Sequence, residues 1–289
     1  MKYCIDYNKK SNILDKADEI NIVYNLKDTT LLEFLLTNQT KRVNICLEDL
    51  DMENQLSAIE KIKDIKKSNE NLQLFIRLQN LNDDLIKKIK EYDLPFYINL
   101  RVNNWDTFRG ILDLGVSDIY ITEDLCFNLL SVSSIAHSRG VQLRTFPNVA
   151  QSQWSSMSSL KKFFIRPEDI DEYSAYIDVV EFFGDVDKTE VLYKIYAIDK
   201  KWMGKLNEII IGFDGDLDSR FILPKFSTYR ANCRKKCLKG GNCRICEAIE
   251  ELSKTLENKG LMFNIKKENP EPKVEEEFKA EIVDLIEKK

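Results

Sequence analysis

The chain has 289 residues, of which 43% are hydrophobic and 31% are charged, and its formal net charge is −5 at pH 7. This composition allows a buried core, and the net charge excludes general binding of polyanions by the chain as a whole. No apolar run approaches the roughly 20 residues of a membrane span, and the N-terminus lacks a secretory hydrophobic region. We therefore expect a cytoplasmic protein without membrane association, built as one large domain with an appendage or as two smaller domains.

Short apolar, β-branched segments recur along the first two thirds of the chain, at intervals of roughly 17–30 residues. Several are continuously apolar, as strands buried on both faces are. The predicted strands cover residues 20–24, 43–47, 72–77, 96–100, 118–122, 141–145, 163–166 and 179–183. Residues 2–7 are a candidate ninth, accessory strand.

Helical patterns lie between these segments. Apolar residues recur every three positions over 56–65 and every four over 81–89, and a similar spacing covers 127–137. Asn82 is placed to cap the second of these helices, and Gly140 to end the third. Strands that alternate with helices predict a (β/α)8 TIM-like barrel over residues 1–200. A doubly wound open sheet is the competing prediction, and the count of eight strands favours the closed barrel.

The carboxyl ends of barrel strands are where catalytic and binding residues of this architecture lie. Four arginines fall at such ends and are candidate substrate-binding residues. They are Arg77, Arg101, Arg144 and Arg166. Because guanidinium groups bind carboxylates and phosphates in a bidentate manner, these residues predict an anionic substrate. An equally weighted alternative is a structural network in which the arginines pair with glutamates. Those glutamates are Glu48, Glu123, Glu168 and Glu181.

Other polar residues near the predicted strand ends complete the candidate site. Glu123 and Glu181 are the candidate acid and base. Asn148 and Gln151 follow the sixth predicted strand and can hydrogen-bond a ligand. The only histidine, His137, falls within a predicted helix, so neither a Ser-His-Asp triad nor a histidine-bound catalytic zinc is expected.

Four clustered cysteines predict a metal centre. Cys233, Cys237, Cys243 and Cys246 are spaced C-x3-C-x5-C-x2-C, with two glycines in the middle of the run. Zinc and iron–sulfur clusters both accept four thiolates in this arrangement, and the compact spacing favours a [4Fe–4S] cluster over zinc. Residues 230–244 also contain six cationic and no acidic side chains. These cations offset the charge of a thiolate-bound centre, and a phosphate-binding patch for RNA is a compatible alternative.

The C-terminal third departs from the barrel rhythm. We expect residues 201–265 to form a cysteine-rich metal-binding extension and residues 266–289 to form a charged linker and an amphipathic helix. Apolar residues recur at every fourth position of that helix, from Val274 to Ile286. This apolar stripe is expected to dock on the chain's own barrel, with the groove of a protein partner as the alternative.

A predicted barrel followed by Arg230-Ala-Asn-Cys233-x3-Cys237 resembles the collagenase-like peptidase family (peptidase family U-thirty-two). The stretches at 146–152 and 163–169 are similar in style to barrel loops of that family. The resemblance implies a [4Fe–4S] cluster held by four cysteines, and hydroxylation of RNA bases or of a quinone precursor rather than peptide hydrolysis. Cys233 and Cys237 match the family's motif. Cys243 and Cys246 depart from it, because relatives take their other ligands from earlier in the chain.

Two hypotheses follow from the sequence. The first is a barrel enzyme with a four-cysteine metal centre that acts on an anionic substrate, with modification of RNA as one candidate reaction. The alternative is a non-catalytic binding or scaffold protein in which the cysteines hold a structural zinc and the C-terminal helix docks a partner.

Overall fold

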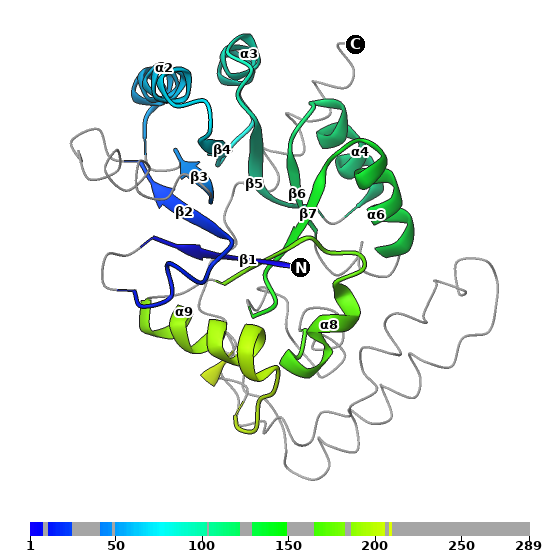
Figure 1. Ribbon diagram of the computed structural model, residues 1–289. Coiled ribbons are helices and arrows are strands. Elements are labelled where there is room, and N and C mark those ends of the chain that lie inside the picture. The colour runs from blue at the N-terminus through cyan, green and yellow to red at the C-terminus, as the bar shows by residue number, and fades with distance from the viewer. Residues whose placement is uncertain are drawn as a thin grey trace, which may run out of the picture.

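A closed barrel of eight parallel strands forms the centre of the computed structural model (Figure 1). The structure describes residues 1–7, 11–24, 41–47, 50–102, 104–121, 129–148, 165–182, 186–205 and 208–209. The strands are β1 (Lys2–Asp6), β2 (Glu19–Val23), β3 (Arg42–Cys46), β4 (Gln73–Leu78), β5 (Phe96–Val102), β6 (Asp118–Ile121), β7 (Gln142–Thr145) and β8 (Val179–Glu181). Each strand pairs with the next in the chain, and β1 pairs with β8 in the register Cys4 to Glu181, which closes the ring.

Helices lie outside the ring of strands, as Figure 1 shows. They are α2 (Met52–Ser68), α3 (Asp83–Glu91), α4 (Trp105–Asp113), α6 (Leu129–Ser138), α8 (Ile170–Tyr173) and α9 (Val186–Tyr193), with a 3-10 helix η1 (Pro167–Asp169) and a π-helix η2 (Lys194–Asp199). The predicted stop and start signals are confirmed. The Asn82 side chain caps α3 by accepting from two backbone N–H groups, and Gly140 after α6 has φ 71°.

The predicted barrel is confirmed, but one of its strands was misplaced. Seven predicted strands correspond to β2 through β8. The strand predicted at 163–166 is not one of the eight barrel strands, and its described residues, 165 and 166, are not in a strand. The accessory role predicted for residues 2–7 is also wrong. The described residues Ile165 and Arg166 lead into η1, because Pro167 fixes a helical φ and has no N–H for a sheet. Lys2–Asp6 instead completes the ring between β2 and β8.

The strands alternate between an apolar outer face and an inner face that is polar at most positions. Buried outward residues on each strand pack beneath the helices and build the main core. They include Ile5, Ile20, Ile45, Ile76, Ile98, Ile119, Leu143 and Val180. Because successive residues of a strand point to opposite faces, the residues between them line the barrel interior. No helix among the described residues is long and apolar enough to cross a membrane.

Candidate functional site

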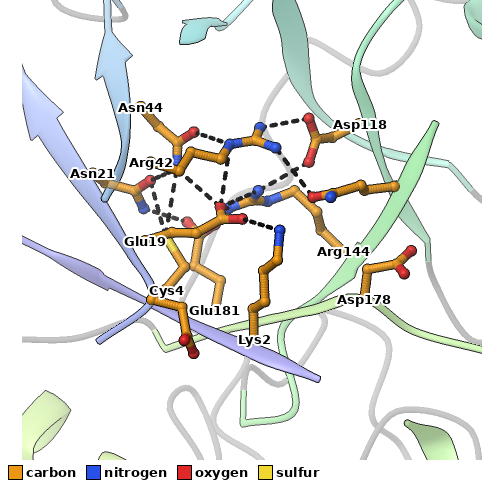
Figure 2. Close-up of polar contacts among 12 residues, drawn as sticks. Lys2, Cys4, Glu19, Asn21, Arg42, Asn44, Asp118, Arg144, Asp178 and Glu181 are labelled. Carbon is orange, nitrogen blue, oxygen red and sulfur yellow. Dashed lines mark hydrogen bonds and ion pairs between the residues drawn. The ribbon is translucent and has the colours of Figure 1, made fainter. Parts of the chain in front are cut away.

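The barrel interior carries ionisable side chains where this architecture usually has layers of branched apolar residues. Three carboxylates and three guanidinium groups point into it, so their formal charges balance. They are Glu19, Asp118, Glu181, Arg42, Arg77 and Arg144, each at most 8% exposed. Figure 2 shows most of this group, which we call the lumen network.

Arg144 on β7 is the centre of the lumen network, and none of its surface is exposed. Its Nη1 and Nη2 donate to Glu19 Oε2 at 2.7 and 2.8 Å, and Nη1 also donates to Asp118 Oδ1 at 3.0 Å. A further ion pair joins its Nη2 to Glu181 Oε2 at 3.5 Å. One guanidinium group therefore contacts carboxylates from β2, β6 and β8.

Arg42 supplies a second cation at the amino-terminal side of the lumen network. Its Nη2 donates to Asp118 Oδ2 at 2.5 Å, and its guanidinium lies 3.5 Å from the centre of the Phe75 ring. Burial acts to raise the pKa of Asp118, but the positive charges of Arg144 and Arg42 outweigh burial and lower that pKa below its usual value. Asp118 is thus held as a carboxylate inside the barrel.

Glu181, the last residue of β8, gathers hydrogen-bond donors at the carboxyl end of the barrel. Arg77 Nη1 on β4 donates to its Oε1 at 2.9 Å, and Asn21 Nδ2 on β2 donates to the same atom at 2.8 Å. The Tyr120 hydroxyl on β6 donates to Oε2 at 2.5 Å. Burial, followed by the negative charge of Glu181, raises the pKa of Tyr120 well above its usual value, so this phenol remains a donor.

A relay of amides connects the two ends of the lumen network. Arg42 Nε donates to Asn44 Oδ1 at 2.9 Å, and Asn44 Nδ2 donates to Asn21 Oδ1 at 3.0 Å. Asn21 Nδ2 then donates to Glu181 and, at 3.1 Å, to Asp6 Oδ1. Asp6 ends β1 and is exposed, so the relay leads from the barrel interior to a carboxylate on the surface.

The structure brings together three of the residues predicted from the sequence, namely Arg77, Arg144 and Glu181. Arg77 pairs with Glu181, a glutamate of the network alternative, whereas Arg144 donates to Glu19 and Asp118, which that alternative did not include. Arg166 lies apart from them, with its Nε 3.4 Å from both Glu168 Oε2 and Asp169 Oδ2. Asn148 is fully buried.

The remaining predicted site residues are only partly described or not described. A bulge in β5 places the backbone of Arg101 opposite Tyr120 of β6, and its side chain is outside the description. Glu123, Gln151, Cys233, Cys237, Cys243 and Cys246 lie outside the described residues. Within the described residues, no three Asp, Glu, His or Cys side chains are grouped to hold a metal ion.

Sequence reasoning missed much of the lumen network because it searched only the ends of the strands. The missed members of the network are Glu19, Arg42 and Asp118. The residues that extend its hydrogen bonds were also missed, namely Asp6, Asn21, Asn44 and Tyr120. A signal was present in β2 and β3, where Glu-Ile-Asn-Ile-Val and Arg-Val-Asn-Ile-Cys alternate polar with apolar residues. Alternation in a parallel strand indicates a polar lumen on one face and a helix-covered surface on the other.

Comparison with known proteins gives little beyond distant structural likeness. No protein-family model matches the chain, and no curated protein matches it. One similar solved structure is described as a native KDPGal structure, at 8% identity and a TM-score of 0.43, covering 68% of this chain and 93% of that chain. Another is 2-keto-3-deoxy-6-phospho-gluconate aldolase from Zymomonas mobilis ATCC 29191, at 16% identity and a TM-score of 0.35, covering 68% and 92%. The barrel itself is established by its strand pairing.

Proposed function

We propose that the protein is a barrel enzyme that acts on an anionic substrate at the carboxyl end of the barrel, around Glu181 and Arg77. The observation that carries the proposal is the convergence of donors from β2, β4, β6 and β7 on the single carboxylate of Glu181. Groups held by several rigid strands are preorganised, which is what catalytic and binding sites require.

The energetics of burial support a functional reason for the lumen network. Replacing a buried ion-pair cluster by well-packed apolar residues is often neutral or stabilising, because desolvation of the charges is costly. Stability alone therefore does not explain six paired acidic and basic side chains in a barrel interior. Perturbed and paired ionisable groups gather at functional sites, and the carboxyl end of the barrel is where such a site is expected.

The residues of this site have different proposed roles. Arg77, whose side chain is 10% exposed, contacts the anionic group of the substrate. Glu181 is the acid–base candidate, and Glu123 remains the second candidate from the sequence. Arg144 is fully buried and acts through Glu181 as a positioning residue rather than by touching the substrate.

A four-cysteine metal centre is the second part of the proposal, with [4Fe–4S] favoured over zinc. Cys233, Cys237, Cys243 and Cys246 would hold it, and the cations of residues 230–244 suit the negative charge of a thiolate-bound centre. An iron–sulfur cluster supplies electron transfer, in keeping with a hydroxylation-type modification, of which RNA is one candidate substrate. A zinc centre would instead fit the scaffold alternative, with a protein partner on the C-terminal helix.

Metal content and colour of the full chain purified without oxygen test the metal centre. Absorbance near ~400 nm with iron and sulfide supports the cluster. One zinc and no colour support the scaffold alternative. Cys237→Ser and Cys243→Ser should each lose metal, whereas the control Cys46→Ala, at a buried cysteine of β3, should keep it. Full metal content in both serine variants would refute the ligand assignment.

Titration with inorganic phosphate, followed by calorimetry, tests the anion site separately. Arg77→Gln should weaken phosphate binding about tenfold or more, as loss of a charge-assisted hydrogen bond does. The matched control is Arg139→Gln, which removes a guanidinium from the exposed pair with Asp113 and should leave binding unchanged. Equal binding by wild type and Arg77→Gln would remove Arg77 from the proposed site.

A further inference from the structure

Asp6 is an exposed carboxylate on the rim of the barrel, one strand from Glu181. It ends β1, and β1 pairs directly with β8 in the register Cys4 to Glu181. Arg77 reaches Glu181 from β4, on the opposite wall of the ring. The carboxyl end of the barrel therefore presents a guanidinium on one wall and an accessible carboxylate on the other.

Asn21 fixes Asp6 and Glu181 relative to each other. Its amide nitrogen donates to Asp6 Oδ1 at 3.1 Å and to Glu181 Oε1 at 2.8 Å, so one NH2 group joins the exposed carboxylate to the buried one. Arg77 and Asp6 consequently lie three hydrogen bonds apart, through Glu181 and Asn21. These contacts hold Arg77 and Asp6 at the same end of the barrel.

The orientation of the Asn21 amide is determined by groups deeper in the barrel. Its Oδ1 accepts from Asn44 Nδ2 at 3.0 Å and from Cys4 Sγ at 3.2 Å. Burial raises the pKa of the Cys4 thiol well above its usual value, so Cys4 is a neutral donor. With two donors on its oxygen, the amide must direct its NH2 group toward the carboxylates. Asn21 is 2% exposed and has no room to turn freely.

We propose that Asp6 is a ligand-contacting residue that accepts hydrogen bonds from a donor group, a hydroxyl or an ammonium, carried by the ligand beside its anion. Asn21 is its positioning residue. This inference rests on the proposed function, because it takes Arg77 as the contact for the anion. A carboxylate is acceptor-only when ionised, so it selects ligands with donors and disfavours a bare anion. The ligand class is thus an anion that also bears hydroxyl or ammonium groups.

Three probes test the inference on the full chain by calorimetry. Inorganic phosphate carries only the anion, glycerol 3-phosphate adds hydroxyls, and phosphoethanolamine adds an ammonium. At least one of the latter two should bind wild type about tenfold or more tightly than phosphate, since a hydrogen bond to a charged group is of that size. The probe that binds more tightly shows whether the donor group is a hydroxyl or an ammonium. Asp6→Asn should remove this preference, and Asp6→Glu, which retains the carboxylate, should restore part of it.

The controls separate the inference from the proposed function. Asp113→Asn removes an exposed carboxylate from the end of α4 and should keep the preference. Asn21→Leu should reduce the preference for the donor-bearing probe, measured as the ratio of the phosphate Kd to the Kd of that probe. A merely structural loss of stability does not change this ratio. If wild type binds phosphate but prefers neither other probe, or if Asp6→Asn keeps the preference, the role of Asp6 is refuted and the anion site at Arg77 is not. If wild type binds no phosphate, the proposed anion site is refuted.

Discussion

Replacement of Arg144 by methionine is the most direct test of the lumen network. Methionine keeps a long, unbranched side chain but removes a guanidinium that donates to Glu19 and Asp118 at 2.7 to 3.0 Å. Both carboxylates and Arg144 itself are 0% exposed, so water cannot replace the lost donor without opening the barrel. Removal of one partner from a buried ion pair costs about 3–5 kcal/mol, because the remaining charge stays buried and uncompensated.

The matched control is Arg139→Met. Arg139 Nη1 lies 2.6 Å from Asp113 Oδ1, a separation as short as any made by Arg144, but the two side chains are 49% and 59% exposed. An exposed pair of this kind contributes about 0.2–1 kcal/mol to stability. The two variants thus differ in burial and in the number of partners, and the expected losses differ by about 3 kcal/mol.

Urea unfolding followed by circular dichroism measures both losses. Because the stability of natural domains is about 5–15 kcal/mol, the expected cost of Arg144→Met should produce a large decrease in the urea midpoint. Arg42→Met, which leaves other partners on Asp118, provides a second variant if Arg144→Met does not fold. Similar, small losses for Arg144→Met and Arg139→Met would refute the conclusion that the lumen network is desolvated.

Three further outcomes are expected. The pKa of Asp118 is lower in the folded protein than in the unfolded chain. As the pH falls below about 4, the unfolded chain therefore protonates Asp118 before the folded protein does. The free energy of unfolding decreases until the pH passes the folded-state pKa. Urea midpoints of wild type should therefore fall more steeply than those of Asp118→Asn between about pH 5 and pH 3, and equal slopes would contradict the assignment. Gly204→Ala would place a Cβ 2.8 Å from Cζ2 of Trp202, so the half-buried indole must move and the tryptophan emission should shift. An unchanged spectrum would show that the contact is not tight. Asn104→Ala should cost about 1 kcal/mol in urea unfolding, because the side chain caps α4 through the Thr107 N–H, and a neutral result would argue against that cap.

Local signals were sufficient to predict seven of the eight barrel strands and two helix ends from sequence. Asn82 before an apolar repeat and Gly140 after one marked helix ends that the structure confirms, because caps depend on neighbouring backbone groups. Segments 163–166 and 2–7 were misassigned because apolar content alone cannot distinguish a barrel strand from a short extended run. The proline that begins η1 was the contrary signal.

The candidate site was predicted in part. Arg77 and Glu181 were identified because they lie near strand ends, where barrel chemistry is expected. Asp6 and Asn21 were missed, since β1 was expected to lie outside the ring and polar residues within strands were not considered. Their importance depends on the adjacency of β1 to β2 and β8, which is a property of the closed barrel.

The sequence by itself determined the alternation of strands and helices and the helix ends at Asn82 and Gly140, because these depend on residues a few positions apart. The tertiary structure decided which charges meet. Arg144 contacts Glu19 across 125 residues of chain, and Arg77 contacts Glu181 across 104. Such pairs depend on strand register and on closure of the ring, and no periodicity within one strand encodes them.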